Sequence, residues 1–111
     1  MADINISKIA GDMLGAALPE LTAGGTAAKN YAEIEFEKIA MQIKFIGEMF
    51  AEGSVNNDEA KALFQMQVNS TKILMLTLEG LSLIVVEKAI NAALGVVRDT
   101  VNTVLKFPLI P

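Results

Sequence analysis

The feature that most constrains this chain is a run of fourteen residues, Ile73 to Val86, which carries a single charge, Glu79, and has Lys72 and Glu87 at its ends. An amphipathic surface helix keeps a polar face, so a run that is apolar almost all round predicts a helix with neighbours on several sides. A membrane-spanning helix needs about 20 apolar residues, and runs of about 10–14 are more typical of buried helices. We therefore favour helix packing over membrane insertion.

Two apolar stripes with helical spacing overlap in this run. The first stripe comprises Ala60, Phe64, Thr71, Leu74, Leu78, Leu81 and Val85. The second comprises Ile90, Leu94, Val97, Val101 and Val104. At 3.6 residues per turn the second stripe extends back to the opposite side of the first. Two geometries satisfy this: one helix through residues 58–106, which we favour, or a break near Gly80, Glu87 or Gly95.

The N-terminal half predicts two helices. Apolar residues from Ile6 to Ala17 recur every three or four residues, which predicts a helix over 6–17. Asp3 or Ser7 is expected to cap this helix, and Pro19 is expected to end it. A longer helix over 26–52 carries a heptad seam of Ala32, Phe36, Ile39, Ile43, Ile46 and Phe50. A second, broken apolar line runs beside that seam and comprises Ile34, Met41, Phe45 and Met49. Two lines predict that this helix touches more than one neighbour.

Residues 53–57, Gly-Ser-Val-Asn-Asn, predict a turn. Asn56 and Glu59 have the spacing of a capping box, and a link this short predicts that the flanking helices run antiparallel. The tail 107–111, Phe-Pro-Leu-Ile-Pro, is expected to leave the helix and pack in a groove of its own chain or of a neighbouring subunit.

The predicted fold class is therefore all-α, in one domain over residues 1–111. A short N-terminal helix (6–17) precedes a long antiparallel hairpin (26–52 and 57–86), a C-terminal helical extension (87–106) and the apolar tail, and the bundle is completed by other subunits. The apolar fraction of 52% supports this expectation, because it exceeds what one small core requires.

Composition excludes several kinds of site. The chain has no Cys and no His, which removes the usual zinc, haem and di-iron ligands, so we predict no metal and no cofactor. A net charge of −4 without a basic run argues against nucleic-acid binding. No basic region precedes the first apolar residues, so we predict no signal peptide and a cytoplasmic location by default, leaving open signal-less export or membrane association.

Two carboxylate features are candidate functional sites. Glu79, alone in the apolar run, would be a proton or ion site if it were buried, but a place on the polar edge with Lys72 and Glu87 is favoured. In the alternating series Glu33, Glu35 and Glu37, Glu35 points away from the other two, and a solvated face is favoured over a metal site. No arrangement predicts a catalytic residue, and we expect no enzymatic activity.

The predicted function is structural: a self-assembling protein whose subunits associate through apolar seams that one chain leaves uncovered. The predicted interaction surface comprises Leu76, Leu83, Val86, Ile90, Leu94, Val97, Val101 and Val104. Leu83→Lys is expected to weaken assembly without loss of helicity. The first alternative is a membrane-active, holin-like or pore-forming protein that inserts residues 73–97. The second is a carrier of an apolar ligand between its helices.

Overall fold

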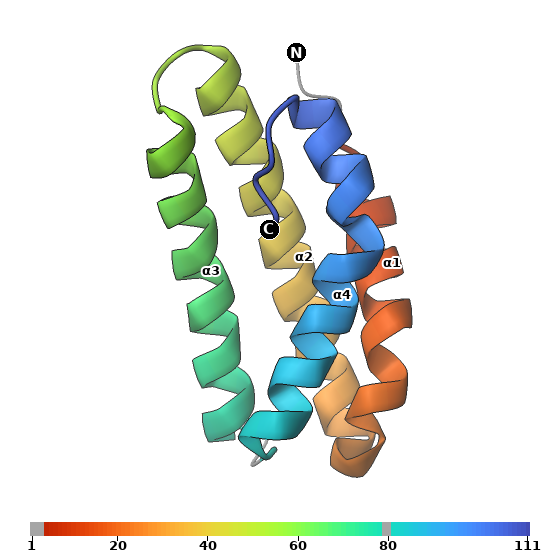
Figure 1. Ribbon diagram of the computed structural model, residues 1–111. Helices are drawn as coiled ribbons and strands as arrows, with labels where there is room; N and C mark the ends of the chain where they lie inside the picture. Colours follow the sequence, from red (N-terminus) through yellow and green to blue (C-terminus); the bar gives the residue numbers. More distant parts are fainter. Residues whose placement is uncertain (1–3, 79–80) are drawn as a thin grey trace.

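The computed structural model describes residues 4–78 and 81–111, and every regular element in these ranges is a helix. In chain order these are α1 (Ile6–Ala17), the 3₁₀ helix η1 (Leu18–Gly24), α2 (Gly25–Ala51), α3 (Asn57–Leu78) and α4 (Leu83–Leu105). The predicted all-α class is confirmed. The α-helices are arranged as an elongated bundle, 42 × 22 × 19 Å in extent (Figure 1).

Helix α1 has the predicted bounds but a different N-cap. Asn5 has an extended backbone, and its side-chain oxygen accepts a hydrogen bond from the backbone N–H of Lys8 at 3.1 Å. Ser7 lies inside the helix, where it has no place as a cap, and Asp3 is outside the described residues. The α-helix ends at Ala17, and Pro19 is accommodated in the first turn of η1, where its missing N–H costs nothing.

The turn between α2 and α3 is closed by local hydrogen bonds at both ends. Gly53, with φ of 79°, donates to the carbonyl of Phe50, and Ser54 donates to that of Met49, which is the Schellman pattern at a helix end. The predicted capping box is confirmed: Asn56 N–H donates to Glu59 Oε1 at 2.9 Å, and Glu59 N–H donates to Asn56 Oδ1 at 2.8 Å. Helices α2 and α3 lie side by side and run in opposite directions (Figure 1).

The favoured single helix through residues 58–106 is wrong. Helix α3 ends at Leu78 and α4 begins at Leu83, so the predicted segments 57–86 and 87–106 become 57–78 and 83–105. The break falls at the alternative near Gly80, although Glu79 and Gly80 themselves lie outside the described residues. Glu87 and Gly95 are within α4. Ser82 caps α4, since its Oγ accepts from Val85 N–H at 3.3 Å, and the reversal lets both apolar stripes bury against one core.

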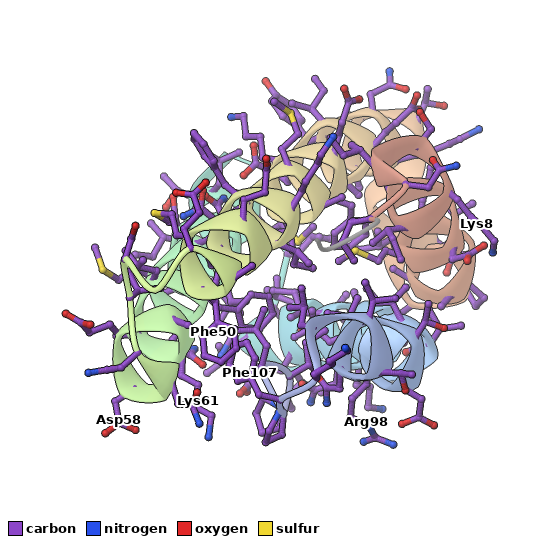
Figure 2. All side chains as sticks on the ribbon, turned by 90° about the horizontal axis from the view of Figure 1, so that it is seen from above. Lys8, Phe50, Asp58, Lys61, Arg98 and Phe107 are labelled. Atoms are coloured by element: carbon purple, nitrogen blue, oxygen red, sulfur yellow. The ribbon has the colours of Figure 1, made fainter. Side chains whose placement is uncertain are left out.

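The core forms where α1 packs closely against both α2 and α4, and α2 packs against α3. Helices α3 and α4 share much less contact, so the ring of helices in Figure 2 is least closed between them. Large side chains that are fully buried at the centre include Met13, Phe36, Ile39, Ile43, Ile46, Phe64, Met75, Ile90 and Val97. The weak α3–α4 contact decides where a groove forms.

The C-terminal tail enters the space between α3 and α4. Lys106 adopts the left-handed conformation (φ 65°, ψ 25°) and turns the chain back. Phe107, Leu109 and Ile110 are buried, and the Phe107 ring stacks on Phe50 of α2 with centroids 4.2 Å apart (Figure 2). The Asn102 amide donates to the Ile110 carbonyl at 2.8 Å and accepts from the Ile110 N–H at 3.0 Å. The tail therefore packs in a groove of its own chain.

Candidate interaction surfaces

The predicted interaction surface on α4 needs correction. Val86, Ile90, Val97 and Val101 are at most 1% exposed, because α4 turns back onto the bundle and presents these residues to the core. They form no surface for a partner in this structure. One continuous helix would have left this seam uncovered, whereas the break before Leu83 turns it toward the core.

The other four predicted residues differ in exposure. Leu76, Leu94 and Val104 are half-buried and pack against the core. Leu83 is 53% exposed at the start of α4, and its neighbour Ile84 is also exposed. Leu83 therefore remains available for the contact that the sequence analysis assigned to it.

A larger uncovered apolar surface lies on the outer side of α2. Its exposed members are Tyr31, Ile34, Met41 and Phe45, the last 64% exposed. With Lys38 and Glu48 they recur at spacings of three and four, as in a coiled-coil seam. Three of them, Ile34, Met41 and Phe45, belong to the second apolar line noted in the sequence and face away from the core, whereas Met49, the fourth member of that line, is half-buried against it.

Helix α3 also carries exposed apolar side chains on its outer side, Met66 and Ile73, both more than 60% exposed. A shallow hollow of about 510 Å³ over Met41 and Phe45 is also lined by Gln67 of α3. Leu74, one heptad beyond Gln67, lines a second hollow of about 540 Å³ with Met66 and Ile73. The first hollow thus reaches from α2 to Gln67 of α3 and to Ile6 of α1, whereas the second is lined by residues of α3. We call the surface of Tyr31, Ile34, Met41, Phe45, Met66 and Ile73 the outer face.

A groove of different chemistry lies between α3 and α4. A hollow of about 350 Å³ is lined by Phe64, Gln65, Val68, Lys72, Ile90, Asn91, Leu94, Gly95, Arg98, Ile110 and Pro111. An adjoining hollow of about 260 Å³ is lined by Lys61, Phe64, Gln65, Pro108, Leu109 and Pro111. Side chains of the tail form part of both walls. This groove could not be predicted from the sequence, because it depends on how α3, α4 and the tail meet.

The buried carboxylate is Glu35 of α2. It is 2% exposed, its Oε1 accepts a hydrogen bond from Thr71 Oγ1 of α3 at 3.3 Å, and its Oε2 lies 3.0 Å from Lys38 Nζ. Glu33 and Glu37 are exposed, so the predicted divergence of the three side chains is confirmed, while the solvated face is wrong for Glu35. The sequence carried a signal of this burial. Glu35 lies four residues before Ile39 and seven after Ala28, and these helical spacings place it on the same side of α2 as those two buried residues.

Thr71→Val is expected to lower the free energy of unfolding by about 1–2 kcal/mol, because it removes the one hydrogen bond between Glu35 and α3 and leaves a buried oxygen without that donor. Urea denaturation measures the loss. Thr77→Val, the same change at an exposed position of α3, is the matched control. Equal effects of the two substitutions would contradict a role for the Glu35–Thr71 contact.

Other sequence features have no site in the described residues. Glu79 lies outside them, so its predicted place is untested. Within residues 4–78 and 81–111, no three His, Cys, Asp or Glu side chains gather as a metal-binding group. In the same part of the chain, no helix combines the length and apolar character that crossing a membrane requires.

Comparison of the chain with protein-family models, with curated proteins and with solved structures finds no significant match.

Proposed function

We propose that this protein is a non-enzymatic structural protein that self-associates, and that the α2–α3 hairpin of one copy packs through its outer face on the hairpin of a second copy. The observation that carries the proposal is that α2 has two apolar seams. One seam packs in the core of the same chain, and the other faces away from that core. An uncovered apolar side of a helix is typical of interaction sites.

The size of the outer face favours contact through both helices. Helix α2, with 27 residues, is about 40 Å long, and a helix is about 10 Å wide. Its outer side alone therefore offers about half of the ~800 Å² per partner that a stable interface buries. The neighbouring α3, with Met66 and Ile73, supplies the remainder.

Charge complementarity favours a second copy as the partner. When two α2 helices run antiparallel with Ile34 of one copy opposite Phe45 of the other, Lys38 lies opposite Met41. The same register brings Glu37 of each copy beside Lys44 of the other, on one side of the seam. The twofold symmetry forms this oppositely charged pair twice, as self-complementary interfaces do. Such pairs at the edges of a helical seam set register and orientation.

Phe45→Glu tests the proposal, because it places a charge on the outer face, opposite Ile34 of the second copy, without touching the core. Light scattering after size exclusion, in detergent-free buffer, is expected to give a multiple of 11.9 kDa for the original chain and the monomer mass for this variant. Ile84→Glu introduces the same charge at a site 67% exposed on α4 and is the matched control. Circular dichroism checks that both variants stay helical.

The charge pair tests the identity of the partner. Glu37→Lys is expected to weaken assembly, and the double variant Glu37→Lys with Lys44→Glu is expected to restore it. A monomeric original chain, or dissociation by Leu83→Lys but not by Phe45→Glu, would overturn the proposal. The second result would instead place the contact at the start of α4.

A further inference from the structure

Methionine supplies all of the sulfur in this chain, because the sequence has six Met residues and no Cys. Oxidation of a Met thioether to the sulfoxide is reversible, and it turns a flexible apolar side chain into a polar one. A Met that an oxidant can reach, and whose apolar character a contact requires, is therefore a site at which oxidation changes that contact.

The described methionines differ widely in exposure. Met13 and Met75 are buried in the core, and Met49 is half-buried against it. Met41 of α2 and Met66 of α3 are 53% and 67% exposed, and both belong to the outer face. Because an oxidant must reach the sulfur atom, Met41 and Met66 are expected to react first.

Met41 lies at the centre of the proposed antiparallel contact between two α2 helices. With Ile34 of one copy opposite Phe45 of the other, the twofold axis passes between residues 39 and 40. At 1.5 Å per residue, the two copies of Met41 are then only about 4–5 Å apart along the helix direction. A change at this one position is therefore made twice, in the middle of the contact.

We propose that Met41 is an oxidation site through which a peroxide dissociates the assembled protein, an inference that rests on the proposed self-association through the outer face. The lone pair of the thioether sulfur attacks one oxygen of hydrogen peroxide. An S–O bond forms as the O–O bond breaks, and the other oxygen leaves as water. The sulfur loses two electrons and the peroxide gains them.

The sulfoxide oxygen weakens the contact because it needs a hydrogen-bond donor that an apolar seam does not supply. Lys38 lies opposite Met41 in the proposed register, but its Nζ is 3.0 Å from Oε2 of the buried Glu35. Turning to the sulfoxide would deprive that carboxylate of its cation. The dissociation constant is expected to rise about tenfold or more. Oxidation of the free chain, whose outer face is open, removes it from the association equilibrium by mass action.

Light scattering after size exclusion, on the full chain before and after dilute hydrogen peroxide, tests the proposal. The mass is expected to fall from a multiple of 11.9 kDa to that of the monomer, with unchanged helicity by circular dichroism. Peptide mass analysis is expected to find one added oxygen on Met41 and none on Met13. Methionine sulfoxide reductases with a dithiol, which becomes a disulfide as the oxygen leaves as water, are expected to restore the assembled mass.

Met41→Leu keeps an apolar side chain of similar size without the sulfur, so this variant is expected to assemble and to stay assembled in peroxide. Met66→Leu is the matched control, because it changes the other exposed Met and leaves Met41 to be oxidised. This control is expected to dissociate in peroxide as the original chain does.

Three results would overturn the oxidation site while leaving self-association intact. They are peroxide dissociation of the Met41→Leu variant, an original chain that stays assembled with Met41 oxidised, and an assembled chain in which Met41 gains no oxygen. An original chain that is monomeric before peroxide is added would overturn the self-association and the oxidation switch together. The first mass measurement therefore tells the two failures apart.

Discussion

Phe107→Ala is expected to lower the free energy of unfolding by about 3–5 kcal/mol, measured by urea denaturation. Phe107 is 6% exposed and stacks on Phe50, so its truncation leaves a cavity at the top of the α3–α4 space and removes an aromatic contact. The effect is large for a tail residue because Leu109 and Ile110 are buried beside it.

Phe107→Leu is the control for this substitution. Leu keeps most of the apolar volume, so the expected loss is under about 1.5 kcal/mol. A loss below about 1 kcal/mol for Phe107→Ala would show that the tail docks separately from folding. The tail would then be an accessory to the bundle and not a part of its core.

Ile90→Ala is expected to lower the free energy of unfolding by about 2–5 kcal/mol, because Ile90 is 1% exposed in the core formed by α4. The same urea denaturation measures the loss. This substitution distinguishes two roles for Ile90. A core residue contributes mainly to the stability of one chain, whereas an interface residue, as predicted from the sequence, contributes mainly to assembly.

Val96→Ala is the matched control on the same helix, where the side chain is 53% exposed, and its expected effect is within about 0.5 kcal/mol. If Ile90→Ala left stability unchanged but altered the mass measured by light scattering, α4 would not pack as described. The two measurements together therefore test the fold and the assembly separately.

The outer face and the α3–α4 groove lie on different sides of the bundle. The outer face belongs to α2 and α3, and the groove belongs to α3, α4 and the tail. Helix α3 contributes to both because only its stripe from Ala60 to Met75 is needed for the core.

The local features of this fold could be predicted from the sequence. The helix over 6–17 matches α1, the bounds 26–52 differ from α2 by a residue at each end, and the Asn56–Glu59 capping box is present. These features depend on hydrogen bonds and side-chain spacing within a few residues. The apolar line of Ile34, Met41 and Phe45 was likewise visible, although its place on an uncovered face was not.

The features that the sequence left open depend on contacts between distant segments. A Gly in a helix costs only about 1 kcal/mol relative to Ala, so Gly80 did not determine whether the chain continues or turns back. The tertiary structure decided this, because the return of α4 buries Ile90 and Val97 against the core. It also buried Glu35 opposite Thr71 and shaped the α3–α4 groove. Periodicity identifies which side of a helix is apolar, whereas only packing determines what covers that side.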